Sequence, residues 1–418
     1  MLEWTRRQSR TRGGIVTGLD IGSSKVCCVI AQIQGEGSFE ILGVGHQLSK
    51  GIKSGIVIDM DEVVTSIVNA VHTAEKMAGL TIRDVMISVN GAHLKSINFA
   101  VELSVSGHAI DEADIRRALF QARQADKDSD LQILHNIPTG YILDGTKGIR
   151  DPRGMYGDRL RVAVHTILSK PGALYNLSTC VARSHLEISG SIAAAYASGL
   201  ACLVEDEREL GAILIDMGGS TTSFAVFYEG QLQYTGCVPL GGDHVTMDIA
   251  RCFLTTLTHA ERLKTLHGSA VASVSDERET IVVPLVGESR GEGINQMPRS
   301  ALVAIIRPRI EETFEHIRTR LLKAGVDLSQ GRRIVLTGGG SQLAGVREIA
   351  SLILGKNIRL GRPLSLGSSE ISQNASFSTC IGLLSYGQAE YLAYLQAMPQ
   401  NWQQWIVAKF KSFFKYIW

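Results

Sequence analysis

The chain has 418 residues, of which 44% are hydrophobic and 20% are charged, and its formal net charge is +1. Because a chain of this length is too long to fold around one compact core, we expect two to four domains or subdomains. A net charge near zero provides no global field to hold a polyanion, so we expect no nucleic-acid partner.

The cysteines and the N-terminus limit the cellular location. The seven cysteines are scattered and include no CxxC pair, which is typical of reduced thiols in the cytosol. The basic N-terminal segment lacks the apolar run of a secretory signal. No apolar stretch reaches the roughly 18 residues needed to span a bilayer. We therefore expect a protein that stays inside the cell, with peripheral membrane contact only.

The first predicted elements are two strands joined by a tight turn. An apolar strand over residues 15–20 ends in Asp20, a Gly/Ser turn follows, and a second apolar run covers residues 26–30. Strand, short turn and strand predict a β-hairpin. A third strand follows a glycine turn at residues 35–37, and residues 61–78 have apolar side chains at helical spacing.

The next segment interrupts this unit. Residues 85–168 contain three predicted strands, at residues 85–89, 101–105 and 161–168. A helix is expected to open at Asp111 and Glu112, because the helix dipole favours acidic residues in the first turn. The sequence therefore predicts an inserted small α+β domain.

The second half of the chain repeats the pattern of the first. Residues 211–216 form an apolar run that ends in Asp216, a Gly/Ser/Thr turn follows, and a second apolar run covers residues 224–227. A turn at Gly230 and a helix from about Asp243 complete the correspondence. We expect two related α/β halves with a cleft between them, and a second, polar insertion over residues 237–306.

The two hairpin turns are suited to binding phosphate. Glycines let the backbone approach a phosphate, and Ser and Thr hydroxyls add donors. Asp20 and Asp216 are placed to hold Mg²⁺ through its water shell. Lys25 adds a positive charge suited to a β- or γ-phosphate. One such turn is most often a plain hairpin, whereas two that face each other are far more specific.

A third glycine turn follows an apolar strand at residues 334–337. Its consecutive small residues offer a flat surface for a purine or ribose: Gly338, Gly339, Gly340 and Ser341. A helix is predicted from about Gln342, and its N-terminus would favour phosphate. The chain has neither a P-loop motif nor a Rossmann fingerprint, so the predicted nucleotide site is of another type.

Several motifs carry a family resemblance. Three of them resemble the phosphate and adenosine motifs of the actin, Hsp70 and sugar-kinase superfamily: GLDIGSSK, IDMGGSTT and VLTGGGSQLAGV. Five more resemble, in order and spacing, the FtsA family of bacterial cell-division proteins: EDERELGAILIDMGGSTT, VPLGGDHVTMDIA, AERLKTLHG, IIRPRIEE and STCIGLLSYG. The likeness implies an α/β, actin-like duplicated ribonuclease-H-type fold. Its inserted α+β subdomain would be the SHS2-like subdomain 1C, and a C-terminal amphipathic helix would end the chain.

The resemblance implies boundaries for these parts. Subdomain 1A would comprise residues 12–84, 169–198 and 362–390, and subdomain 1C residues 85–168. Subdomain 2A would comprise residues 199–236 and 307–361, and subdomain 2B residues 237–306. A linker at residues 391–400 and the amphipathic helix at residues 401–418 would follow.

The resemblance also implies site residues, with ATP and Mg²⁺ as the cofactors. One side of the phosphates would be lined by Gly22, Ser23, Ser24 and Lys25, and the other by Gly218, Gly219, Ser220 and Thr221. Residues near the nucleotide would be Gly241 and Gly242, with the pair Glu261 and Lys264 beside the ribose and base. A plain surface i,i+3 ion pair explains that pair equally well.

Arg309 matches a family segment associated with docking the FtsZ tail, and a solvated arginine at a helix start is an equal alternative.

Hydrolysis of ATP needs a group that orients or deprotonates the attacking water. Stronger hydrolases of the superfamily carry Glu or Gln just before the helix that joins the halves. Residues 188–195 of this chain contain neither. We therefore expect ATP binding with slow or negligible turnover.

The last residues, from Asn401, have an amphipathic pattern. At about 100° per residue, one face carries Trp402, Trp405, Ile406, Phe410, Phe413, Phe414 and Ile417. Lysines and a glutamine lie on the opposite face: Gln404, Lys411 and Lys415. An aromatic face opposite lysines predicts a helix that lies in a membrane surface and binds anionic lipids. A terminal helix packed on the core is the alternative.

The resemblance implies a membrane-tethered, ATP-binding adaptor on the inner face of the cell membrane at the division septum. Its partners would be the FtsZ C-terminal tail, other copies of itself in actin-like filaments, and later division proteins. Alternatives are a scaffold such as PilM or MreB, a sugar or acetate kinase, and a chaperone ATPase. The missing catalytic side chain and the tail argue against a kinase, and the place of the insertion argues against the other scaffolds.

Overall fold

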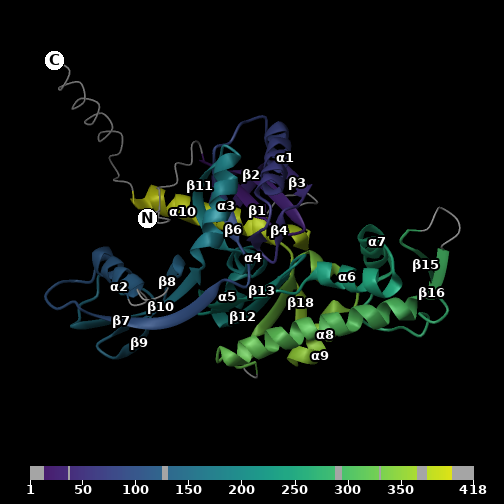
Figure 1. The fold of residues 1–418 in the computed structure, drawn as a ribbon. Coiled ribbons are helices and arrows are strands. Elements are labelled where there is room, and N and C mark those ends of the chain that lie inside the picture. The colour runs from purple at the N-terminus through teal and green to yellow at the C-terminus, as the bar shows by residue number, and fades with distance from the viewer. Residues whose placement is uncertain are drawn as a thin grey trace, which may run out of the picture.

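The structure is a computed structural model that describes residues 14–35, 38–124, 130–287, 294–328, 331–364 and 374–397. Its body contains two five-stranded sheets (Figure 1). The first has the order β11 (Glu187–Ala193), β6 (Asp84–Val89), β1 (Ile15–Ile21), β2 (Lys25–Gly35) and β3 (Ser38–Leu48). The second has the order β18 (Ile358–Leu360), β17 (Arg333–Thr337), β12 (Ala212–Met217), β13 (Thr222–Tyr228) and β14 (Gln231–Val238).

The two sheets share one topology. In each, the first strand of a hairpin pairs antiparallel with the second strand and parallel with a strand that comes later in the chain. The turns also match, because Gly22 N donates to Lys25 O at 3.0 Å and Gly218 N donates to Thr221 O at 2.9 Å. The predicted duplication of an α/β unit is therefore confirmed.

One strand lies elsewhere than expected. The sequence placed residues 85–89 in the insertion, but β6 lies inside the first sheet, between β1 and β11. Five of its six residues are buried, as is typical of a parallel strand covered on both faces. The placement at the start of the insertion was therefore wrong by one strand.

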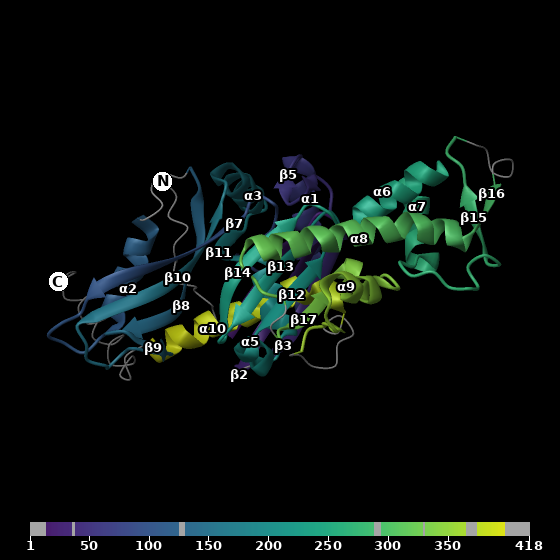
Figure 2. The same cartoon turned by 90° about the horizontal axis from the view of Figure 1, so that it is seen from below.

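The insertion has a sheet and a helix of its own. Its sheet has the order β7 (Lys95–Ser104), β10 (Arg159–Ser169), β8 (Gln132–Leu143) and β9 (Thr146–Ile149), and α2 (Glu112–Gln124) packs on it. Leu160 and Val162 of β10 form a core with Ala118 and Ala122 of α2. The predicted small α+β unit is confirmed, and it projects at the end of the molecule opposite to β15 and β16 (Figures 1 and 2).

The outer face of the first sheet is covered by α1 (Met60–Ala78), as predicted, and by α3 (Pro171–Arg183). The side chain of Asp59 caps α1 by accepting hydrogen bonds from the backbone of Asp61 and Glu62. Gly79, with φ of 67°, ends the helix. A short hairpin of β4 (Ile52–Lys53) and β5 (Ile56–Val57) precedes α1.

A layer of two helices lies between the sheets. We call α4 (Ala194–Cys202) and α10 (Ser378–Ala397) the middle helix layer, because one core cluster joins them to strands of both sheets. The two helices touch through their backbones, since a Cβ atom added at Gly382 would lie 1.8 Å from Ala197 O. Small residues are required here because two sheets and two helices meet in one layer. The remaining short helices nearby are α5 (Glu205–Leu210) and the 3₁₀ turn η3 (Ala375–Phe377).

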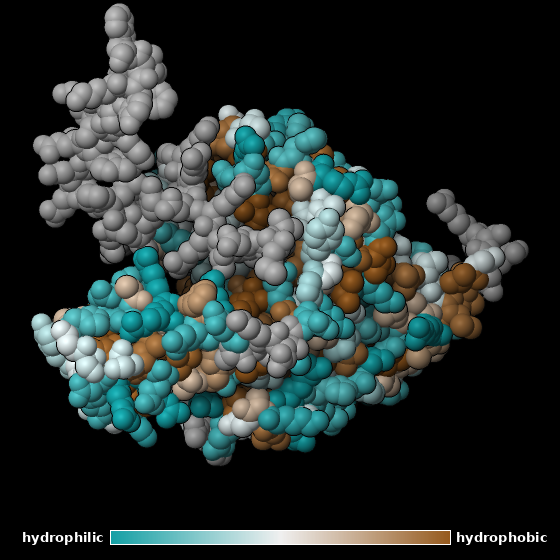
Figure 3. Space-filling view, turned by 60° about the vertical axis from the view of Figure 1, so that its left-hand side comes forward, coloured by the Kyte–Doolittle hydropathy of each residue, from teal (hydrophilic) through white to brown (hydrophobic). Residues whose placement is uncertain are grey.

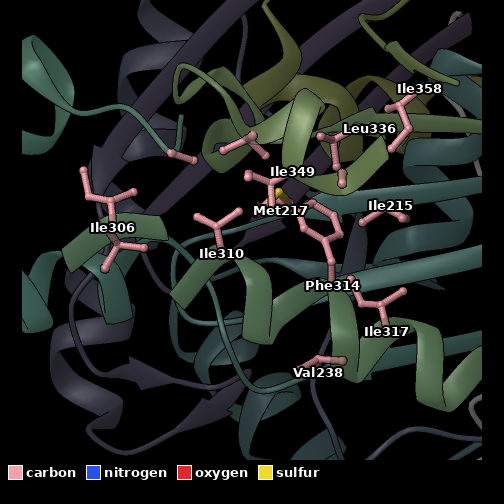
Figure 4. Close-up of a cluster of buried hydrophobic side chains, with 14 of the residues drawn as sticks. Ile215, Met217, Val238, Ile306, Ile310, Phe314, Ile317, Leu336, Ile349 and Ile358 are labelled. Carbon is pink, nitrogen blue, oxygen red and sulfur yellow. The ribbon is translucent and has the colours of Figure 1, made fainter. Parts of the chain in front are cut away.

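The outer face of the second sheet is covered by α6 (Gly242–Phe253), α8 (Arg299–Lys323) and α9 (Val346–Leu354). Phe314 and Ile310 of α8 pack with Ile215, Met217 and Leu336 of the sheet (Figure 4). The N-terminal end of α8 follows directly after β16 (Ile294–Pro298), which forms a hairpin with β15 (Thr280–Pro284). This hairpin and α7 (Leu257–His267) lie at the same end of the molecule (Figure 2). The predicted helix from Asp243 is confirmed as α6.

Two helix boundaries differ from the predicted ones. The third glycine turn leads into a 3₁₀ turn, η2 (Gly339–Gln342), and α9 begins only at Val346, because Gly345 adopts φ of 79° before it. At the other end, α10 reaches Ala397 and so includes most of the predicted linker, whose residues are largely good helix formers. The predicted membrane helix, residues 401–418, lies outside the described residues.

The surface is mixed in character. Hydrophilic residues cover much of the face in Figure 3, and hydrophobic residues gather in several smaller areas. Scattered exposed apolar residues are ordinary for a folded protein. Within the ranges that the structure describes, no helix combines the length and the apolar character needed to cross a membrane.

Candidate functional site

Two loops from the two halves meet between the sheets. We call residues 20–25 the Asp20 loop and residues 216–221 the Asp216 loop. Ser220 N donates to Ser23 Oγ at 3.0 Å, and a Cβ atom added at Gly219 would lie 2.8 Å from Ser24 Cβ. Nearly 200 residues separate the two loops in the sequence, so the expectation that they face each other is confirmed.

Asp20 lies near the end of β1 and is partly buried. Ser88 Oγ donates to Asp20 Oδ1 at 2.6 Å. Burial raises the pKa of Asp20 to about 6, although the Ser88 hydrogen bond and the positive charge of Lys25 act in the opposite direction. Burial therefore disfavours the charged form of Asp20, as is typical of a carboxylate at a functional site that meets a cation.

Asp216 lies near the end of β12 and is held by the middle helix layer. Its Oδ2 accepts hydrogen bonds from Ser198 Oγ at 2.5 Å and from Thr379 Oγ1 at 3.0 Å. Burial raises the pKa of Asp216, while the two hydroxyls and Lys25 lower it. The negative charge of Asp216 in turn raises the pKa of Asp20, so the two carboxyl groups lie within electrostatic range of each other.

Lys25 follows the first turn and points toward η3. Its Nζ donates to Ser376 Oγ at 2.9 Å and lies 3.6 Å from the centroid of the Phe377 ring. The same charge lowers the pKa of both Asp20 and Asp216. Lys25 is thus a cation close to both carboxylates, and its expected contact with a phosphate remains a prediction.

The third glycine turn lies against Asp216. β17 pairs parallel with β12, with Thr337 opposite Asp216, so the turn after Thr337 starts beside the carboxylate. Gly338 has φ of 87°, and a Cβ atom there would lie 2.3 Å from Asp216 Oδ1. Only glycine suits this position. The rest of the turn stays close, because Gly340 packs on Met217, Gly339 faces Ser376, and Ser341 Oγ donates to Gly338 O.

The start of α6 closes the Asp216 loop from another side. Gly242 N donates to Gly218 O at 3.0 Å, and a Cβ atom at Gly241 would lie 2.4 Å from Gly219 O. Lys264 Nζ of α7 donates to Gly242 O at 3.1 Å and lies 2.6 Å from Glu261 Oε2. The predicted Glu261 and Lys264 pair therefore exists and contacts the predicted glycine pair.

Arg309 lies apart from these loops. Its guanidinium forms an ion pair with Asp248 of α6, with Nε and Oδ2 2.6 Å apart, and another with Glu312. Arg309 lies ten residues into α8, so the alternative of an arginine at a helix start does not hold. Its expected role with a partner remains a prediction.

The sequence did not reveal five other residues of the site: Ser54, which contributes its backbone, and Ser88, Asn90, Ser198 and Thr379, which contribute their side chains. Asn90 joins the halves, because its Nδ2 donates to Thr221 Oγ1 at 3.0 Å and its Oδ1 accepts from Ser223 Oγ at 2.6 Å. Ser54 N donates to Ser220 Oγ at 2.9 Å. Ser88 and Asn90 lie at the carboxyl end of β6, and ligand sites in α/β sheets favour that edge. If β6 had been assigned to the first sheet from the sequence, its carboxyl end would have indicated Ser88 and Asn90 as candidate site residues.

Together these residues offer hydroxyl groups and backbone amides from both loops, with Lys25, Lys264 and carboxylates beside them. Hydroxyls, amides and a lysine are donors for phosphate oxygens, and a carboxylate suits the water shell of Mg²⁺. The lack of side chains at Gly219 and Gly338 lets the loops approach closely, because an added Cβ atom would lie 2.8 Å from Ser24 Cβ and 2.3 Å from Asp216 Oδ1, respectively. The residues present therefore fit a magnesium nucleotide.

Comparison with known proteins agrees with this fold. Residues 213–382 match the family model "Cell division protein FtsA", and residues 91–168 match "SHS2 domain inserted in FTSA". The chain is 44% identical over 391 residues to cell division protein FtsA of Agrobacterium fabrum, covering 91% of this chain and 88% of that protein. It is 33% identical over 386 residues to that of Escherichia coli K12, covering 90% and 91%.

Solved structures show a similar fold at low sequence identity. A chain of a PilM-PilN type IV pilus biogenesis complex aligns with a TM-score of 0.64 at 17% identity, covering 89% of this chain and 98% of that one. MreB5 of Spiroplasma citri bound to ADP aligns with a TM-score of 0.52 at 14% identity, covering 91% and 97%. The fold is therefore actin-like. On its sequence similarity over nine-tenths of its length, the chain belongs to the FtsA family of cell division proteins.

Proposed function

We propose that this chain binds ATP with Mg²⁺ between the Asp20 loop and the Asp216 loop. The observation that carries the proposal is the meeting of the two loops, with Ser220 N 3.0 Å from Ser23 Oγ. A phosphate oxygen is a stronger acceptor for that amide than a neutral hydroxyl, because it carries charge. The same chemistry applies to Lys25, whose ammonium group is suited to a terminal phosphate.

Each part of the nucleotide has its own set of residues in this proposal. The phosphates lie on Gly22, Ser23, Ser24 and Lys25 and on Gly218, Gly219, Ser220 and Thr221. The waters of Mg²⁺ contact Asp20 and Asp216. The adenosine lies near Gly241, Gly242, Glu261, Lys264 and the turn formed by Gly338, Gly339, Gly340 and Ser341. Turnover is slow, because residues 188–195 contain no Glu or Gln to activate water.

In the cell, we propose an adaptor at the division site on the inner face of the membrane. Its tail, residues 401–418, lies in the membrane surface and binds anionic lipids. The body docks the C-terminal tail of FtsZ with the help of Arg309, assembles with other copies of the chain, and recruits later division proteins. The comparisons with cell division proteins support this role, and the pattern of the tail supports the contact with lipid.

Co-sedimentation with lipid vesicles tests the role of the tail. We expect the intact chain to pellet with vesicles that contain anionic phosphatidylglycerol and to bring FtsZ with it in the presence of Mg²⁺ and ATP. A version that ends at Gln400 should stay in the supernatant and still bind FtsZ, because the body is unchanged. Vesicles of neutral lipid serve as the control and should retain much less of the intact chain. Full membrane binding by the shortened version would show that residues 401–418 are not required for membrane binding.

A further inference from the structure

The two carboxylates of the site are held in different ways. We propose that Ser198 and Thr379 are positioning residues, which hold Oδ2 of Asp216 by hydrogen bonds. Only Oδ1 of Asp216 is then left to accept a hydrogen bond from the water shell of Mg²⁺ bound to the nucleotide. This inference rests on the proposed binding of ATP. It adds two residues of the middle helix layer to the site and gives Asp216 a task that Asp20 does not share.

Two hydroxyl groups hold Asp216 Oδ2. This oxygen accepts from Ser198 Oγ at 2.5 Å and from Thr379 Oγ1 at 3.0 Å, and the two hydroxyls lie 2.9 Å apart. Ser198 is fully buried and Thr379 is 9% exposed. Hydrogen bonds from a hydroxyl to a carboxylate are about twice as strong as those between neutral groups. Two such donors leave Oδ2 little capacity to accept from a water of Mg²⁺.

The other oxygen, Oδ1, packs against the third glycine turn. A Cβ atom at Gly338 would lie 2.3 Å from it, and the φ of 87° there also excludes most other residues. Two hydroxyls donate to Oδ2, whereas none of the described residues donates a hydrogen bond to Oδ1. Oδ1 is therefore the oxygen with capacity to accept from a water of Mg²⁺.

Asp20 is held differently. Ser88 of β6 donates to one oxygen of Asp20, and both residues belong to the first sheet. Ser198 and Thr379 instead belong to α4 and α10, which lie between the sheets. The orientation of Asp216 therefore depends on the packing of the middle helix layer, whereas that of Asp20 depends on a neighbouring strand.

The test uses the full chain with the changes Ser198→Ala and Thr379→Val, and a titration with ATP at pH 7 with and without Mg²⁺. We expect each change to weaken the binding of ATP with Mg²⁺ by roughly tenfold and to leave the binding of ATP without Mg²⁺ nearly unchanged. Thr379→Ser keeps a hydroxyl and should restore the affinity for ATP with Mg²⁺. Ser385→Ala is the matched control, because Ser385 lies on α10 but donates to Ile381 O.

Each outcome has one meaning. If the unchanged chain binds no ATP, the proposed function fails and this inference fails with it. If it binds ATP but Ser198→Ala and Thr379→Val keep the affinity of the unchanged chain for ATP with Mg²⁺, only the positioning role is overturned. Binding that weakens equally with and without Mg²⁺, and that Thr379→Ser does not rescue, would also overturn that role, because a loss of packing alone explains it.

Discussion

The Asp20→Asn variant is expected to lose ATP binding that depends on Mg²⁺ and, without ligand, to be more stable than the unchanged chain at pH 7. Binding is lost because an amide carries no charge for the water shell of Mg²⁺. Stability rises because the buried carboxylate has a pKa of about 6, above its usual 3.8. The folded chain therefore binds more protons than the unfolded chain between about pH 4 and pH 6.

The sign of the pH effect follows from this shift. As the pH rises through that window, the unchanged chain loses up to about 3 kcal/mol of unfolding free energy from this group. The variant lacks this loss, so its advantage should grow from pH 4 to pH 7. Unfolding by denaturant at several pH values and titration with ATP, with and without Mg²⁺, measure the two effects.

A matched control separates the buried charge from a general change of charge. Asp59→Asn removes an exposed carboxylate at the start of α1, where asparagine caps a helix equally well. This control should leave both ATP affinity and stability nearly unchanged. Normal affinity of the Asp20→Asn variant for ATP with Mg²⁺ would show that Asp20 does not serve the metal.

The second large effect is expected at the contact between α4 and α10. Gly382→Ala should lower the unfolding free energy by about 3 kcal/mol, because the new Cβ atom would lie 1.8 Å from Ala197 O and both helices are enclosed by the two sheets. The same change should weaken ATP binding, since Ser198 and Thr379 lie on these helices. Unfolding by denaturant and titration with ATP are the measurements.

Gly172→Ala is the control for this change. Gly172 lies on α3, and no atom lies within 4 Å of the position of an added Cβ. Alanine there should be neutral or stabilise the protein by up to about 1 kcal/mol. If Gly382→Ala proved as stable as the unchanged chain, the backbone contact between α4 and α10 would be refuted.

The parts of the fold that could be predicted are those that a local sequence pattern indicates. Each hairpin is marked by an apolar run that ends in Asp, a glycine turn and another apolar run, so the duplication and the facing loops could be expected. The strand at residues 84–89 was assigned to the wrong unit, because a buried run does not say which sheet it joins. The start of α9 was missed because no local pattern marks the left-handed conformation of Gly345 or its close approach to Val271.

The parts of the site that could not be predicted depend on distant contacts. Ser198 and Thr379 are 181 residues apart and meet only because α4 and α10 pack together between the sheets. A hydroxyl in an apolar helix most often bonds to the carbonyl of the preceding turn, as Ser385 does. The sequence pattern is the same when the hydroxyl holds a carboxylate, so only the packing distinguishes the two cases.

A crystal structure of the full chain with Mg²⁺ and a slowly hydrolysed ATP analogue tests the central claim most directly. The account predicts phosphates between the Asp20 loop and the Asp216 loop, with a phosphate oxygen in place of Ser23 Oγ as the acceptor for Ser220 N, and Mg²⁺ beside Asp20. A nucleotide bound elsewhere, with Ser23 and Ser220 still in direct contact, would contradict it.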